Sequence, residues 1–83
     1  MREKLIRLIL LALKTFDGEP APERALFMHV KIGAAPERPT DSDLRDALGA
    51  VESAGLALGV TDDLLKTRTW TLTPMGTHRA RQL

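Results

Sequence analysis

Apolar residues between positions 3 and 16 recur at intervals of three and four, the spacing of one face of an α-helix. This pattern predicts a first helix that lies against the hydrophobic core. Gly18, followed by Pro20, is suited to ending this helix and beginning a turn. The predicted core face consists of Leu5, Ile9, Ala12, Leu13 and Phe16.

The same helix carries more apolar side chains than one core contact needs, because Leu8 and Leu11 extend the apolar surface beyond a single stripe. Two explanations are open: the helix lies centrally and packs on two sides, or its outer face meets a second copy of the chain. A chain of 83 residues buries little apolar surface alone, so a homodimer is expected. Its predicted interface consists of Ile6, Leu10 and Leu13.

Residues 23–32, ERALFMHVKI, fit either of two patterns. Their apolar positions can be grouped at helical spacing, but every second residue from Leu26 to Ile32 is also apolar, as in a strand. Pro22 at the start and the acidic Glu23 in the first turn favour a helix, because both residues are suited to a helix N-terminus. We therefore expect a second helix here.

The pattern over residues 40–55 predicts a third helix with clear ends. Thr40 is a typical N-cap, and Gly55 is placed to end the helix in a left-handed conformation. The inward face consists of Leu44, Ala47, Leu48, Val51 and Ala54. The outward face consists of Ser42, Asp46, Gly49 and Ser53, with Arg45 beside them.

Two segments after the third helix have the alternation of strands. Residues 56–60, LALGV, and 67–73, TRTWTLT, are predicted to be half-buried strands, and the link TDDLLK is short enough to pair them as a hairpin. Leu64 and Leu65 in this link either fold back under the hairpin or face a protein partner. Thr73 and Pro74 then begin a short basic helix.

Two short motifs stand at the ends of these elements. The first ends the third helix with Leu48, Val51, Glu52, Gly55 and Leu56, and the second, LT-x-x-G, closes the hairpin with Leu72, Thr73 and Gly76. The order of elements, together with these motifs, resembles the winged helix-turn-helix domain of MarR-like and PadR-like transcriptional regulators. The resemblance implies an α+β fold with a three-helix bundle, a β-hairpin wing and a short C-terminal helix, in one domain over residues 1–83. It also implies a third helix in the major groove of DNA and a wing on the backbone.

Composition and charge indicate the cellular compartment of this domain and the partners that it can attract. The absence of cysteine excludes disulfides and fits a reducing cytosol, so we expect a cytoplasmic protein. The unbroken apolar run from Leu8 to Leu13 is far shorter than the roughly 20 residues that span a bilayer, so no membrane association is expected. The formal net charge of +1 provides no general attraction for a polyanion, and DNA binding must depend on local charge.

The candidate DNA contacts lie on the third helix and the hairpin, but their charge is mixed. Arg45 is the only base among the outward residues of the third helix. Gly49 costs the helix roughly 1 kcal/mol relative to alanine, which indicates close approach by a neighbouring helix, a partner or DNA. The full candidate set is Ser42, Arg45, Asp46, Gly49, Ser53, Lys66 and Arg68.

No catalytic chemistry is indicated. The two histidines, His29 and His78, lie far apart in different elements, without the spacing of a catalytic pair or a metal site. We therefore expect no enzyme, no cofactor and no metal. The predicted function is a DNA-binding module of the transcription-regulator type. The alternative is a winged helix that serves protein contacts or dimerisation and does not bind DNA.

Overall fold

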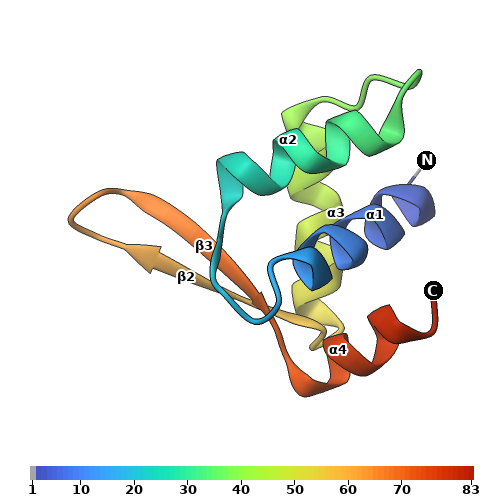
Figure 1. The fold of residues 1–83 in the computed structure, drawn as a ribbon. Coiled ribbons are helices and arrows are strands. Elements are labelled where there is room, and N and C mark those ends of the chain that lie inside the picture. Colours follow the sequence, from blue (N-terminus) through green and yellow to red (C-terminus); the bar gives the residue numbers. More distant parts are fainter. Residues whose placement is uncertain (1) are drawn as a thin grey trace.

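The structure is a computed structural model that describes residues 2–83. These residues form four helices and a three-stranded antiparallel sheet, in the order that the sequence predicts apart from one added short strand (Figure 1). The elements are α1 (Arg2–Thr15), β1 (Ala21–Pro22), α2 (Glu23–Ala34), α3 (Asp41–Ser53), β2 (Ala57–Asp62), β3 (Thr67–Leu72) and α4 (Pro74–Arg81).

Helix α1 occupies the centre of the fold. It packs against α2, α3 and α4, and Figure 1 shows it between α2 and α4. Leu10 and Leu13 are only 2% and 3% exposed, so they face the core of the single chain and leave almost no surface for a second copy. Ile6 is partly buried against the same core. The central position therefore explains the wide apolar surface. Leu13 is buried, as its place on the predicted core face requires, and the predicted dimer interface has almost no exposed surface at Leu10 or Leu13.

Residues 23–34 form a helix, as the N-terminal signals of this segment predict. Leu26, Phe27 and Val30 are buried, whereas Met28 and Ile32, which a strand would have placed beside Leu26 and Val30, are exposed. Helical spacing explains this division, because positions 26 and 30 lie one turn apart on the same face. The first turn of α2 carries Glu23 and Arg24 toward the sheet, beside the start of β3.

Helix α3 has the ends that its sequence predicts. The Thr40 hydroxyl accepts a hydrogen bond from Asp43 N at 3.1 Å, and Thr40 N donates to Asp43 Oδ2 at 2.9 Å, which together form a capping box. Gly55 follows the helix with φ of +75°, the left-handed conformation expected there. The buried residues of α3 are Leu44, Ala47, Leu48 and Val51.

The sheet has the strand order β1-β3-β2, so β3 is central and β2 forms one edge. Ala21 pairs with Trp70 on one side of β3, and Gly59 pairs with Trp70 on the other. The buried Trp70 and Ala57 face the helices, while Leu58 and Val60 lie on the exposed face of the hairpin. The hairpin formed by β2 and β3 projects away from the helices (Figure 1).

The core joins residues from every helix and from all three strands. Trp70, the one tryptophan of the chain, is its largest fully buried side chain. Of the helices between residues 2 and 83, none combines the length and the apolar character needed to cross a membrane.

Candidate interaction surface between α3 and the hairpin

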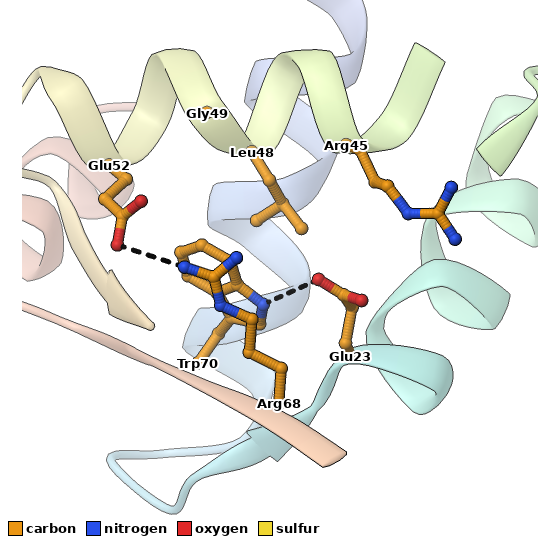
Figure 2. Close-up of a pocket in the computed structure, with 7 residues that line it drawn as sticks. All are labelled: Glu23, Arg45, Leu48, Gly49, Glu52, Arg68 and Trp70. Atoms are coloured by element: carbon orange, nitrogen blue, oxygen red, sulfur yellow. Dashed lines mark hydrogen bonds and ion pairs between the residues drawn. The ribbon is translucent and has the colours of Figure 1, made fainter. Parts of the chain in front are cut away.

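An open hollow of about 180 Å³ lies between α3 and β3 (Figure 2). Helix α3 borders it along one side, β3 lies across from α3, and the first turn of α2 reaches it from a third direction. Three elements that are distant in sequence therefore meet at this hollow. Its lining residues are Glu23, Arg45, Leu48, Gly49, Glu52, Arg68 and Trp70.

Helix α3 contributes Arg45, Gly49 and Glu52 to the hollow, at intervals of four and three residues that place them on one side of the helix. A Cβ added at Gly49 would meet no heavy atom within 4 Å. No described part of the chain therefore approaches this glycine, which rules out the neighbouring helix considered above. The result is a stretch of bare helix backbone beside Arg45.

The Arg68 guanidinium lies over the Trp70 ring, with its central carbon 4.7 Å from the ring centre. An Arg68 terminal nitrogen is 3.7 Å from Glu52 Oε2, so α3 and β3 are joined by an ion pair. At the edge of the ring, Trp70 Nε1 donates to Glu23 Oε1 at 3.2 Å. Figure 2 shows the Arg68–Glu52 ion pair and the Trp70–Glu23 hydrogen bond, with the carboxylates of Glu52 and Glu23 on opposite sides of the indole.

A second hollow of about 220 Å³ adjoins the first, since Glu23 and Arg68 line both. It lies between the first turn of α2 and the hairpin and adds Arg24 and Lys66 to the cationic residues of this side of the molecule. Within residues 2–83, Arg68 is the only one of these cations with an ion-pair partner within 4.0 Å. The cations that border the two hollows are Arg24, Arg45, Lys66 and Arg68.

The acidic residues in the first half of α3 are engaged elsewhere. Asp41 Oδ1 accepts a hydrogen bond from Lys31 Nζ at 2.6 Å. This bond and the Lys31 charge hold the pKa of Asp41 below its ordinary value. Asp43 is occupied by the capping box, and together with Asp46 it lines a different hollow, beside Arg2 of α1. Asp43 and Asp46 therefore lie on the α1 side of α3, whereas Asp41 lies one turn before Arg45, whose charge also acts on it.

Of the predicted DNA contacts, the structure brings Arg45, Gly49 and Arg68 to one hollow and Lys66 to the adjoining one. The remaining three, Ser42, Asp46 and Ser53, line neither hollow. Asp46 lies on the α1 side of α3, and Ser42 and Ser53 are exposed near the two ends of the helix.

Sequence reasoning missed the contribution of α2 to this surface. Glu23 and Trp70 are 47 positions apart, and no periodic pattern links residues at such a separation. Arg24 was not singled out, because a base in the first turn of a helix carries no motif. Glu52 was noticed only as part of the motif at the end of α3, without a partner.

The hairpin tip has an apolar surface. Leu64 and Leu65 are 89% and 68% exposed, so they do not fold back under the hairpin. Asp62 Oδ1 accepts hydrogen bonds from the backbone N–H groups of both leucines, at 2.9 and 3.2 Å, and this local turn holds them at the tip. Leu58 and Val60 of β2 are exposed as well.

The bases near the two ends of the chain lie apart from these hollows. Arg7 of α1 and Arg79 of α4 border another hollow, together with Glu3 and Leu83. His29 is exposed and makes an edge contact with the Phe16 ring, at 5.6 Å between ring centres. In the described part of the chain, no group of three or more His, Asp or Glu side chains is placed to hold a metal ion.

Comparisons with known proteins give no match: no family model matches the chain, and no curated protein or solved structure is significantly similar to it.

Proposed function

We propose that the chain is a winged-helix module of the transcription-regulator type that binds double-stranded DNA. Helix α3 would face the major groove and the hairpin would contact the backbone. The observation that supports this proposal is the gathering of Arg24, Arg45, Lys66 and Arg68, from α2, α3 and the hairpin, around two adjoining hollows. Arginine and lysine side chains are the main phosphate ligands of DNA-binding proteins.

Local charge makes this side of the molecule suitable for DNA despite a formal net charge of only +1. Asp43 and Asp46 lie toward α1, away from Arg45, and Asp41, which is near Arg45, is engaged in its ion pair with Lys31. The bare backbone at Gly49 allows a phosphate or a base edge to come close to α3.

The test measures binding to a labelled DNA duplex of random sequence at increasing salt concentrations, with fluorescence anisotropy as the readout. Each cation that contacts a phosphate adds about 0.9 to the steepness of the log-log salt dependence, so Arg45→Ala is expected to weaken binding and lower the slope by about one. Arg79→Ala is the matched control, because Arg79 lies beside α1 on another hollow. Absence of binding at low salt would exclude the proposal.

A second candidate is a protein-binding module that uses the hairpin. The exposed apolar surface of Leu58, Val60, Leu64 and Leu65 supports it, because apolar side chains grouped on a projecting hairpin favour a protein surface over a phosphate backbone. Its test is retention of a partner from lysate by the wild type and by the Leu64→Ser/Leu65→Ser variant. The control is Met75→Ser, which changes an exposed apolar residue of α4. Equal retention by all three proteins would remove this candidate.

A further inference from the structure

We propose that Glu52 competes with a nucleic-acid phosphate for Arg68 and thereby limits the affinity of the surface between α3 and the hairpin. In this role Glu52 is a positioning residue: it acts through the Arg68 guanidinium and does not itself contact the nucleic acid. The inference rests on the proposed DNA binding and adds a restraint on one of its phosphate ligands.

The Arg68 side chain is held back toward α3 by contacts on two sides. Its guanidinium stacks on Trp70 at 4.7 Å and pairs with Glu52 Oε2 at 3.7 Å (Figure 2). Its Nε lies close to Gly59, since a Cβ added there would be 3.1 Å from that nitrogen. The side chain therefore folds across β2 toward α3, where the Glu52 carboxylate neutralises its charge.

The platform beneath the guanidinium is rigid. Trp70 is buried, and its Nε1 hydrogen bond to Glu23 fixes the orientation of the indole. A Cβ at Gly59 would be 2.9 Å from two carbons of the ring, so the ring also packs tightly against β2. The position of Arg68 is therefore determined by the packed Trp70 ring and by its partly exposed ion-pair partner, Glu52.

The Glu52 interaction is weak enough to be exchanged. Both side chains of the pair are about two-fifths exposed, at 43% for Arg68 and 39% for Glu52, and exposed ion pairs contribute little to stability. Among the described residues, Arg68 is the only cation within ion-pair distance of Glu52. The Glu52 carboxylate lies beside the guanidinium, so it competes with a phosphate that approaches the hollow and repels it.

The test compares the wild type with Glu52→Gln in the same duplex titration. Release of Arg68 is expected to tighten binding at low salt by roughly three- to tenfold and to steepen the salt slope by about one, because one more cation contacts a phosphate. Glu37→Gln is the matched control. It removes the same charge from the Lys4–Glu37 pair, whose side chains are similarly exposed at 44% and 42%, but which does not border the two hollows.

A double variant shows whether Glu52 acts through Arg68. In the Arg68→Ala background, Glu52→Gln is expected to give no gain in affinity beyond that of Glu37→Gln in the same background. An equal gain in both backgrounds, or an equal gain from Glu37→Gln in the wild type, would mean that only net charge matters and would overturn the inference.

The outcomes separate the inference from the proposed function. If the wild type and Glu52→Gln bind DNA equally well, the inference fails and the proposed function stands. If only Glu52→Gln binds, the restraint is real and the wild-type chain is not a DNA-binding module. If neither protein binds, both are wrong.

Discussion

The Cα of Gly76 in the first turn of α4 lies directly against the carbonyl oxygen of Leu56, which precedes β2. A Cβ at position 76 would overlap this oxygen and come within 2.8 Å of the Leu56 carbonyl carbon. The same oxygen accepts a hydrogen bond from Thr73 N at 3.0 Å. The motif LTPMG thus has a physical basis, because α4 can dock on the start of β2 only without a side chain at this position.

Gly76→Ala is expected to lower the free energy of unfolding by roughly 3 kcal/mol, since the obstacle is backbone and cannot move aside as a side chain would. Gly49→Ala is the control. It adds the same methyl group to a helix position with open space, and it is expected to raise stability by about 0.5 to 1 kcal/mol. Urea denaturation followed by Trp70 fluorescence measures both, and similar effects at the two glycines would contradict the packing of α4 described here.

Thr73 joins two helix ends through one hydroxyl group. Its Oγ1 accepts a hydrogen bond from Gly76 N at 3.0 Å, as the N-cap of α4, and donates to Gly55 O at 2.6 Å, beyond the end of α3. Thr73→Ala is therefore expected to cost about 1 to 2 kcal/mol in thermal or urea denaturation. Thr73→Ser keeps the hydroxyl and is expected to retain most of this stability. Equal losses for the two variants would assign the effect to the methyl group.

Glu23 supplies the acceptor for the indole N–H of Trp70. Glu23→Ala leaves this partly buried donor without its protein partner and is expected to cost about 1 kcal/mol of stability. Glu23→Gln retains a side-chain oxygen at the same position and is expected to lose less. Equilibrium unfolding measures both variants, and the near-ultraviolet circular dichroism of Trp70 reports whether the ring keeps its orientation. Equal losses would show that the hydrogen bond contributes nothing.

The Asp41–Lys31 pair predicts a pH dependence with a definite sign. Because Lys31 lowers the pKa of Asp41 in the folded chain, the carboxylate stabilises the fold above its ordinary pKa of 3.8, and this contribution is lost as the pH falls through the lowered pKa. Asp41→Asn is expected to be less stable than the wild type at neutral pH, with the difference disappearing in strong acid. Thermal unfolding from pH 2 to pH 7 measures the difference, and a constant difference would contradict the pairing.

The hydrophobic pattern and the end signals of the elements sufficed to predict most of the fold. Thr40 and Gly55 defined α3 because capping and left-handed conformations are local properties of a few neighbouring residues. Pro22 and Glu23 likewise resolved the ambiguity of α2 in favour of a helix. The short strand β1 was missed, since two residues carry no alternation and pair only because β3 lies beside them.

Local sequence could not determine which partner each surface residue has. The apolar surplus of α1 was compatible with a central helix and with a dimer interface, and only the packing of α2, α3 and α4 around it buried Leu10 and Leu13. Asp46 and Arg45 are adjacent in the sequence but lie on the two flanks of α3, toward α1 and toward the hairpin. The direction of a side chain follows from the helix period, but its environment depends on elements elsewhere in the chain.

The sequence by itself determined the order of the four helices and of the two hairpin strands, because caps, turns and periodic apolar faces act over a few residues. Only the tertiary structure decided that Glu23, Glu52, Arg68 and Trp70 form one linked group, since these residues come from three elements and meet through packing alone. The acidity of α3 was visible in the sequence. Only the fold showed that Asp43 and Asp46 lie toward α1, whereas Glu52 is paired with Arg68 on the hairpin side.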